Sequence, residues 1–456
     1  MEKRGAWRSI KILSKINNRT AKVAVFGLGY VGFPHAAIIA EAGFQVTGVD
    51  LNSKIVRAVS EGNISMNEPG LSDLIRQITK KGFLKATLNG SVAVREAGII
   101  IISVPTPVRK DKTPDLSYIK QACNNIARNL NEGKLIILES TLPPKTTKTF
   151  IAPILEQGSG LKCGQDFWLA YCPERITTGK ALKEFIENDK IVGGYNTESA
   201  EIAAEFLKTF VKGNIHVTDA TTAEVAKLAE NTFRDINIAF ANQLALICEQ
   251  TGVDASEAIK LANTHSRVNI HTPGPGVGGP CIPKDPYLLL HSSKPTEYDI
   301  IKTARKINDY MPKHILKLIL QALKKTGKDV RSSRIAILGT AYKADVEDSR
   351  LSPSEPIIHE LTRLGAEVTV YDPYCNESFG AKKAISLNEA IKNADCIAII
   401  TDHTVFKKLK LQEIKASMND KPAIIDGRRT IDPHEAKNIG FTYYGIGFGA
   451  QTNEKE

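Results

Sequence analysis

Long apolar runs are missing from this sequence of 456 residues. A membrane-spanning helix needs about 20 consecutive apolar residues, whereas the longest apolar run, residues 98–105, is typical of a buried strand. The first 20 residues carry six Lys and Arg side chains but no apolar block before a small-residue cleavage site, so we expect no signal peptide. The sequence therefore predicts a protein without a membrane segment.

Cysteine is also scarce. The seven cysteines are odd in number and widely scattered, and no two of them have C-x-x-C spacing. This pattern argues against a disulfide framework and against a zinc ribbon. We therefore expect a reducing, cytoplasmic setting and no metal site.

Neither charge nor polarity is extreme. A composition of 42% hydrophobic and 24% charged residues excludes disorder as the dominant state. The 60 basic and 50 acidic residues give a net charge of +10, but the lysines are spread along the chain and form no block. This spread argues against a dedicated nucleic-acid surface and favours a small polyanion, such as a nucleotide, as the partner.

Short apolar segments alternate with helical stretches in both halves of the chain. At roughly 100–200 residues per domain, the length predicts two or three domains. Between the halves, residues 221–250 contain neither Pro nor Gly and predict one long helix that connects them. The alternation predicts parallel sheets covered by helices on both faces. The predicted strands are residues 22–27, 44–50, 99–104, 135–138, 334–338, 367–372, 396–401 and 423–426.

A G-x-G-x-x-G motif closes the first predicted strand and opens the first helix of this alternating pattern. Gly27 permits a tight turn, Gly29 lets backbone approach a pyrophosphate, and Gly32 lets the helix pack on the strand. Asp50 ends the next strand, where an acid can accept both ribose hydroxyls. The residues after Asp50, Leu-Asn-Ser, include no arginine for a 2′-phosphate, so NAD is favoured over NADP. The alternative is a glycine-rich turn without a ligand.

Cys281 lies in a segment, residues 272–286, that is too rich in Gly and Pro for regular structure. Flanking glycines leave space for a ligand, and Lys284 would favour the thiolate if its side chain turned back toward the sulfur. The alternative is a small buried hydrophobe, the usual state of a cysteine. Because no other cysteine lies in such a loop, Cys281 is our candidate nucleophile.

Polar residues on the long helix form a second candidate set. Lys227, Asn231 and Arg234 have i, i+4, i+7 spacing and share one face. The alternative is a solvated face on which Glu224 and Glu230 pair with Lys227.

Two acids directly after predicted strands, Glu139 in EST and Glu174 in CPER, are ambiguous in isolation. The loops that leave parallel strands are, however, where ligands bind.

Taken together, these residues resemble the UDP-glucose/GDP-mannose dehydrogenase family from about Lys22 to Gly447. The resemblance rests on eight motifs in the order of that family. They are GLGYVG at 27–32, VPTP at 104–107, EST at 139–141, CPER at 172–175, AKLAENTFR at 226–234, PGPGVGGPCIPKD at 273–285, GTAYKADVEDSR at 339–350 and DGRR at 426–429.

The resemblance implies an NAD-dependent, four-electron oxidation of a sugar C6 hydroxyl to a carboxylate. Cys281 would form a thiohemiacetal and then a thioester. Lys227 would stabilise the oxyanion, and Asn231 would hold the same oxygen or a water. Asp285 resembles the acid/base partner, and Glu174 the residue that assists hydrolysis.

The resemblance also implies which residues bind cofactor and substrate. The cofactor set is Gly27, Gly29, Tyr30, Val31, Gly32, Asp50, Thr106, Thr141 and Arg350. The substrate set is Arg175, Ile176, Lys227, Asn231, Arg234, His265, Arg267, Gly278, Tyr342, Lys343 and Arg428, with Arg267 a candidate to reach across a dimer interface. Ile55 stands where some members have an arginine, so the adenosine-side arginine stays unassigned.

The fold and the domains follow from the pattern and the resemblance together. We expect an α/β chain with two Rossmann-like doubly wound parallel-sheet domains joined by a long central helix. Residues 1–20 would be a basic tail, 21–218 the NAD-binding domain, 219–330 a central helical domain with the cysteine loop, and 331–456 a UDP-sugar-binding domain.

The most specific expectation concerns the substrate. The lead-in from Asn263 to Ile270 is similar to the branch that oxidises UDP-N-acetylhexosamines, and we expect UDP-N-acetyl-D-mannosamine. UDP-N-acetylglucosamine and UDP-glucose remain alternatives, as does a nucleotide-sugar sensor without chemistry. We expect a cytoplasmic homodimer or higher homo-oligomer that supplies polysaccharide biosynthesis and binds neither nucleic acid nor membrane.

Overall fold

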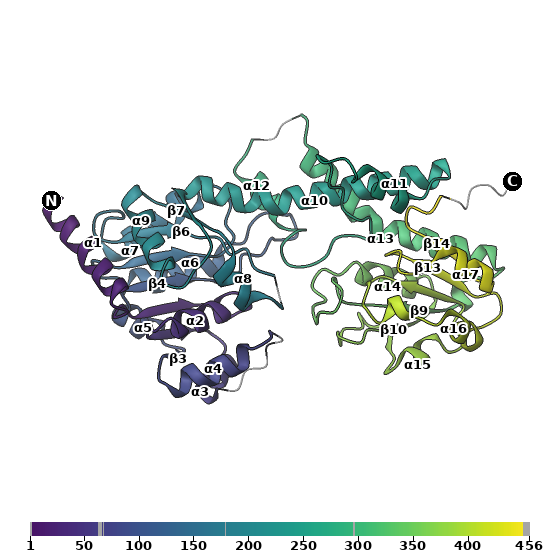
Figure 1. The fold of residues 1–456 in the computed structure, drawn as a ribbon, viewed down its shortest axis with the longest axis horizontal. Coiled ribbons are helices and arrows are strands. Elements are labelled where there is room, and N and C mark those ends of the chain that lie inside the picture. Colours follow the sequence, from purple (N-terminus) through teal and green to yellow (C-terminus); the bar gives the residue numbers. More distant parts are fainter. Residues whose placement is uncertain (1, 63–65, 67, 178, 295–296, 450–456) are drawn as a thin grey trace. The chain divides into compact units, whose positions relative to one another are not determined.

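The computed structural model describes residues 2–62, 66, 68–177, 179–294 and 297–449, with side chains from residue 7 onward. Residue 1 of the predicted tail 1–20 and residues 450–456 of the predicted domain 331–456 lie outside the described residues. The chain divides into two units (Figure 1). Unit 1 comprises residues 1–230 and 287–294, and unit 2 comprises residues 231–286 and 295–456.

Eight strands form the sheet of unit 1, in the order β3-β2-β1-β4-β5-β6-β7-β8. The register places Val23 of β1 opposite Val46 of β2 and Ile99 of β4. Within the described residues every neighbouring pair is parallel except β6 and β7, a reversal that the sequence pattern did not predict. The strands are β1 Val23–Phe26, β2 Val46–Val49, β3 Leu84–Thr87, β4 Ile99–Ile102, β5 Leu135–Leu138, β6 Trp168–Tyr171, β7 Lys190–Gly194 and β8 Ile215–Asp219.

Helices cover both faces of this sheet (Figure 1). Side chains alternate between two cores along β1, because Val23 and Val25 belong to one apolar cluster and Ala24 and Phe26 to the other. The four isoleucines of β4 are all buried, as expected for a strand covered on both faces. The helices of unit 1 are α2 Gly32–Glu41, α3 Ser53–Glu61, α4 Leu71–Lys80, α5 Gly90–Glu96, α6 Ser117–Ala127, α7 Ala152–Ser159 after a π-helical turn Thr147–Ile151, α8 Ala181–Glu187 and α9 Thr197–Leu207.

The basic N-terminal segment, which we expected only as a tail, forms helix α1 (Glu2–Asn17). Ile12 and Ile16 point into the first core and are 2% and 0% exposed. Arg8 forms ion pairs with Glu132 and, at 2.6 Å, with Asp166. These contacts join α1 to unit 1.

One unbroken helix, α10 (Ala220–Thr251), replaces the alternating pattern in the middle of the chain (Figure 1). Asp219 caps its first turn, because Oδ1 accepts hydrogen bonds from the backbone N–H groups of Thr221 and Thr222. The predicted long helix is therefore confirmed. The boundary between the two units falls within α10, between Glu230 and Asn231.

Unit 2 contains a second sheet, in the order β11-β10-β9-β12-β13-β14, and its described strands are all parallel. The doubly wound α/β fold class is thereby confirmed for both halves. The strands are β9 Arg334–Leu338, β10 Glu367–Tyr371, β11 Lys382–Lys383, β12 Cys396–Ile399, β13 Ala423–Asp426 and β14 Thr442–Gly445. The helices are α11 Ala255–Ala262, α12 Asp285–His291 (shared with unit 1), α13 Ile300–Lys325, α14 Ser354–Arg363, α15 Leu387–Ile391, α16 Leu411–Ser417 and α17 Pro433–Ile439, with short 3₁₀ turns at Val330–Ser332 and Phe406–Lys408.

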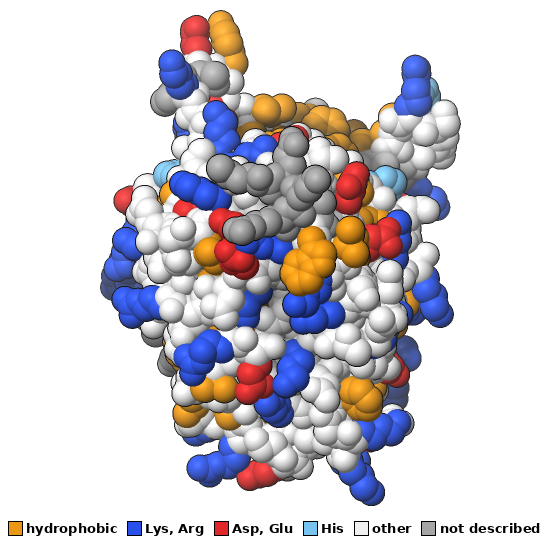
Figure 2. Space-filling model, turned by 90° about the vertical axis from the view of Figure 1, so that its left-hand side faces the viewer, with side chains coloured by type: hydrophobic (Ala, Val, Ile, Leu, Met, Phe, Trp, Pro, Cys, Tyr) orange, Lys and Arg blue, Asp and Glu red, His pale blue; other side chains and the backbone are white. Residues whose placement is uncertain are grey.

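The excess of Lys and Arg over Asp and Glu is not gathered into one patch on the face drawn in Figure 2. Figure 2 shows Lys and Arg side chains spread over one face of the protein and interrupted by acidic and apolar groups. None of the described helices has the length and apolar composition needed to cross a bilayer.

The packing of α1 gives a first test. Ile16→Ala should lower the free energy of unfolding by about 2–4 kcal/mol, because a fully buried side chain is removed from a packed core. Ile10, on the same helix but 65% exposed, is the matched control, and Ile10→Ala should cost less than about 0.5 kcal/mol. Urea unfolding measures both. Equal effects of the two substitutions would show that α1 does not belong to the folded core.

Candidate functional site

The glycine turn after β1 has three glycines with different tasks. Gly27 adopts φ +90°, and a Cβ there would lie 2.5 Å from the carbonyl oxygen of Ser103. A Cβ on Gly32 would lie 2.0 Å from the carbonyl oxygen of Gly27. A Cβ on Gly29 would meet no protein atom within 4 Å. Gly27 and Gly32 therefore serve packing, whereas Gly29 leaves its backbone open to a ligand.

Asp50 is held beside this turn at the carboxyl end of β2. Its Oδ2 accepts a hydrogen bond of 2.9 Å from the backbone N–H of Leu28, and Oδ1 accepts one of 2.8 Å from that of Asn52. Each oxygen keeps further acceptor capacity. An open backbone cradle next to an oriented carboxylate fits the pyrophosphate and the ribose of a dinucleotide.

The other predicted cofactor residues of unit 1 lie at the same edge of the sheet. Tyr30 is 47% exposed, and Val31 directly precedes α2. Thr106 Oγ1 donates a hydrogen bond of 2.7 Å to the carbonyl of Thr141, which links the loops that follow β4 and β5. Arg350 belongs to unit 2, where its guanidinium binds the carboxylate of Asp348.

The cysteine loop lies in unit 2. Cys281 is exposed, whereas the other six cysteines are buried, and none of the seven forms a disulfide. Its carbonyl accepts hydrogen bonds from the N–H groups of Lys284 (3.0 Å) and Asp285 (2.9 Å). Because α12 begins at Asp285, the predicted irregular segment 272–286 extended two residues too far. Lys284 Nζ lies 3.4 Å from Asp285 Oδ1, so its charge is shared with that carboxylate.

Glycine backbone in the loop lies directly against two predicted substrate residues. Cβ atoms on Gly278 and Gly279 would lie 2.6 and 2.7 Å from Tyr342, and a Cβ on Gly274 would lie 2.8 Å from Arg428 Nη1. A side chain on Gly278 or Gly279 would force Tyr342 or the loop to move, whereas one on Gly274 would displace the flexible end of Arg428. The structure therefore brings the Cys281 loop together with Tyr342 and Arg428.

Asn231 and Asp285 also meet within unit 2. Asn231 Nδ2 donates a hydrogen bond of 2.6 Å to Oδ2 of Asp285, whose side chain is fully buried. On the preceding turns of α10, the alternative of a solvated face on which Glu224 and Glu230 pair with Lys227 is wrong. Glu224 is buried and accepts hydrogen bonds from Thr147 N–H and Oγ1, and Glu230 pairs with Arg175 at 2.8 Å.

The remaining predicted substrate residues differ in exposure. Arg428 Nε donates to the carbonyl of Ile400 at 3.1 Å, and burial lowers the pKa of its guanidinium. Arg175 and Ile176 lie partly exposed in unit 1. The exposed residues of the set are Arg234, His265, Arg267 and Lys343.

One acid that holds a loop of the second sheet in place was not predicted from the sequence. Asp372 follows β10 as Asp50 follows β2, and its Oδ2 accepts hydrogen bonds from Thr340 N–H, Ala341 N–H and His403 Nε2 at 2.7–2.9 Å. Burial acts to raise the pKa of Asp372, but the bonds from His403 and Ala341 outweigh it and lower the pKa to about 2. This acid therefore holds the loop after β9. The similar strand endings VTGVD and VTVYD were the signal.

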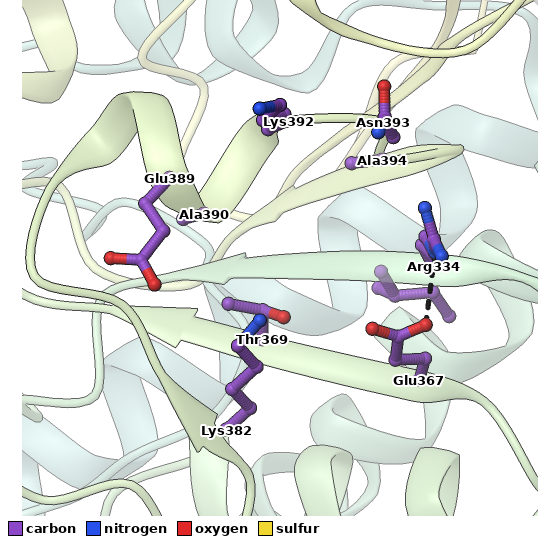
Figure 3. A pocket seen from close by; sticks show the side chains of 10 residues that line it. Arg334, Glu367, Thr369, Lys382, Glu389, Ala390, Lys392, Asn393 and Ala394 are labelled. Carbon is purple, nitrogen blue, oxygen red and sulfur yellow. Dashed lines mark hydrogen bonds and ion pairs between the residues drawn. The ribbon is translucent and has the colours of Figure 1, made fainter.

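A cavity of about 220 Å³ lies at the other end of the second sheet (Figure 3). Arg334 and Glu367, the first residues of β9 and β10, pair across it at 3.0 Å, with Lys382 and Glu389 nearby. Ligands of parallel sheets bind at the carboxyl ends of the strands. The cavity is thus separate from the predicted site, and none of the predicted site residues lines it.

The glycine turn, the oriented acid at the end of β2 and the doubly wound sheet define a dinucleotide-binding protein. Three family models then match consecutive parts of the chain. They are the NAD binding domain (residues 21–211), the central domain (221–310) and the UDP binding domain (336–433) of one family. The chain belongs to the UDP-glucose/GDP-mannose dehydrogenase family, and it is an NAD-dependent dehydrogenase of UDP-sugars.

Individual relatives agree with this assignment. A UDP-N-acetyl-D-mannosamine dehydrogenase of Pyrococcus horikoshii is 42% identical over 428 residues, which cover 94% of this chain and 99% of that one. The solved structure of the UDP-D-ManNAc dehydrogenase from P. horikoshii superposes with a TM-score of 0.89 at 41% identity and covers 94% of this chain and 100% of that one. An NDP-N-acetyl-D-galactosaminuronic acid dehydrogenase from Methanosarcina mazei superposes with a TM-score of 0.87 at 36% identity, covering 98% and 99%.

The glycine turn supplies a paired test. Gly29→Ala should fold as the natural protein does but bind NAD at least about tenfold more weakly, because the new methyl group enters the open space beside the turn. Gly32→Ala should instead lower stability by about 2 kcal/mol or more, because its Cβ overlaps backbone. Calorimetric titration and thermal unfolding separate the two effects. Unchanged NAD affinity in Gly29→Ala would show that the cofactor does not use this turn.

Proposed function

We propose that this protein oxidises C6 of UDP-N-acetyl-D-mannosamine to UDP-N-acetyl-D-mannosaminuronate, using two NAD and one water for each sugar. The relatives bearing the mannosamine dehydrogenase name support this substrate. The central observation is the position of Cys281. It is the exposed cysteine, and its loop lies against Tyr342 and Arg428 of the half that matches the UDP binding domain.

The first oxidation removes a hydride from C6 and a proton from its hydroxyl. NAD, when bound, accepts the hydride in each of the two oxidations. The Cys281 thiolate then adds to the aldehyde and gives a tetrahedral thiohemiacetal, the species that can lose a second hydride. In this proposal Lys227 stabilises the oxyanion, a task worth roughly 3–4 kcal/mol where such a donor is removed. Asn231 and Asp285 provide a coupled amide and carboxylate for proton transfer.

Loss of the second hydride leaves a thioester on Cys281. Water must then attack the acyl carbon, and the carbon–sulfur bond breaks to give the uronate. Glu174 assists this step as the base that accepts a proton from water. Tyr342, Lys343 and Arg428 hold the UDP portion, and Arg175, Ile176, Arg234, His265, Arg267 and Gly278 complete the proposed substrate set.

A second substrate class deserves the same test, because the M. mazei relative is named for a galactosaminuronic acid. UDP-N-acetylglucosamine and UDP-glucose are further candidates. These sugars are reasonable candidates because they share the C6 hydroxyl and a nucleoside diphosphate group, and they differ only in the substituents or configuration at ring carbons such as C2 and C4.

The substrate test supplies each UDP-sugar with NAD and follows NADH and the product mass. We expect two NADH for each uronate, with UDP-N-acetyl-D-mannosamine having the highest kcat/KM. Cys281→Ser should lower uronate formation about 10³-fold or more while UDP-sugar binding stays measurable, because the serine hydroxyl stays protonated at neutral pH and is a much weaker nucleophile than a thiolate. Turnover of UDP-glucose alone would overturn the substrate choice. Unchanged turnover in Cys281→Ser would exclude the covalent route, and no turnover of any sugar would favour a sensor.

We also propose the domain limits 21–218, 219–330 and 331–456, a cytoplasmic location, a role in polysaccharide biosynthesis and a homodimer. The homodimer has a physical basis in unit 2. Phe233, Phe240 and Ile247 are 67%, 55% and 46% exposed, and they recur every seven residues along α10. A seven-residue apolar repeat places a stripe on one helix face, which a second copy of this chain would cover.

The oligomer test replaces the centre of this stripe. Phe240→Asp should convert the dimer to monomers at micromolar concentration, because it introduces an unpaired charge into the apolar contact. Ile385→Asp is the matched control, since Ile385 is 91% exposed and lies far along the chain from α10. Light scattering after size-exclusion chromatography measures both. A dimer that persists in Phe240→Asp would place the interface elsewhere.

A further inference from the structure

Four titratable side chains of unit 1 meet in a buried cluster that the proposed mechanism uses only in part. His35 lies on α2, Glu139 follows β5, Glu174 follows β6 and Lys190 begins β7, and each is less than one-tenth exposed. A buried charge is costly unless partners compensate its lost hydration. The pairing inside the cluster therefore decides which of its groups are charged.

Lys190 and Glu174 form a bidentate ion pair. Lys190 Nζ lies 3.0 Å from each carboxylate oxygen, and Oε1 also accepts a hydrogen bond of 2.7 Å from the backbone N–H of Arg175. The ammonium stands 3.9 Å from the ring centroid of Phe185, whose face attracts a cation. Lys190 thus compensates the charge of Glu174 and fixes its orientation.

His35 and Glu139 form the second pair. Nδ1 of His35 contacts Oε1 of Glu139, and the imidazole packs on Phe185 with ring centroids 4.0 Å apart. Burial lowers the pKa of His35 well below its ordinary 6.5, and burial raises the pKa of Glu139 to about 8. At neutral pH this pair carries no net charge and supplies no fixed cation to its neighbours.

The other groups near Glu174 supply no positive charge either. Burial raises the pKa of the Cys172 thiol, which keeps it protonated. The guanidinium of Arg175 is directed to Glu230, with Nε 2.8 Å from its carboxylate. Within the described part of the chain, Lys190 is the cation that pairs with Glu174.

From this geometry we propose that Lys190 is the positioning residue for Glu174, and that its ammonium pairs with both oxygens of the Glu174 carboxylate and holds it oriented for hydrolysis of the Cys281 thioester. The inference rests on the proposed function. In that step water adds to the acyl carbon, Glu174 accepts one proton from the water, and the carbon–sulfur bond breaks with its electron pair on sulfur. A protonated Glu174 could not accept that proton.

Removal of the ammonium would leave Glu174 beside Glu139 in a dry site without a paired cation. Burial in a low-dielectric site without a paired cation favours the protonated form of a carboxylate. Hydrolysis would then fail at neutral pH, whereas the two hydride transfers, which do not need this base, would continue.

The test compares Lys190→Met with Lys190→Arg in the full-length protein, with NAD and UDP-N-acetyl-D-mannosamine. In Lys190→Met we expect a rapid burst of NADH, a steady-state rate about 10²-fold lower, and the thioester on Cys281 in mass spectra of quenched protein. The acid limb of its pH–rate profile should move to higher pH. Lys190→Arg keeps the charge and should retain about a tenth or more of the rate, with the acid limb in place.

Lys134→Met is the matched control. Lys134 is also buried in unit 1, but its ammonium donates to backbone carbonyls, including those of Arg95 (3.1 Å) and Ala97 (2.7 Å). Its loss should lower stability without trapping the thioester. Should Lys190→Met not fold, Lys190→Gln, which removes the charge but keeps two N–H donors, should show the same trapped thioester and the same shift of the acid limb.

Three outcomes would overturn the inference. If folded Lys190→Met or Lys190→Gln protein shows the same NADH time course and the same acid limb as the natural protein, Lys190 does not act through Glu174. The same trapped thioester in Lys134→Met would show a general effect of removing a buried lysine. If the natural protein forms no Cys281 adduct and Cys281→Ser turns over normally, the proposed covalent route fails first, and the role of Lys190 fails with it.

Discussion

The place of the cysteine loop depends on the absence of Cβ atoms at three positions. Gly274 lies against the end of the Arg428 side chain, and Gly278 and Gly279 lie against Tyr342 at distances that leave no room for a Cβ atom. Because protein interiors are close-packed, this contact determines where the loop can lie on the second sheet. The exposed sulfur of Cys281 and the side chains expected to hold UDP are thereby parts of one local structure.

The two sheets use the same strand position for different tasks. Asp50 and Asp372 each end the second strand of a doubly wound sheet, and each accepts hydrogen bonds from the loop after the first strand. Asp50 accepts two bonds and keeps room for ribose hydroxyls. The carboxylate of Asp372 already accepts hydrogen bonds from several backbone N–H groups and from His403, so it stabilises the loops around it and does not need a ligand. The same strand position thus carries the acid proposed to bind the cofactor ribose in one half and an acid with a structural role in the other.

Two buried ion pairs show how the described part of the chain compensates buried charge. Arg305 and Asp235 pair at 2.6 Å between α13 and α10, and Lys190 and Glu174 pair between β7 and the loop after β6. Such pairs offset part of the free-energy cost of removing each charged group from water. In the first case the pair joins two helices of unit 2, and in the second it prepares a base for the proposed hydrolysis.

The sequence by itself determined the features that depend on neighbours along the chain. The glycine turn with Asp50, the long helix without Pro or Gly, and the Gly- and Pro-rich cysteine loop were all predictable, because backbone propensity and short-range spacing specify them. Tertiary structure alone decided the pairing of Lys190 with Glu174, the burial of Ile16 on α1 and the antiparallel strand β7. These features depend on which strands and helices the topology places side by side. The order of residues along the chain does not specify the distances between elements that are far apart in the sequence.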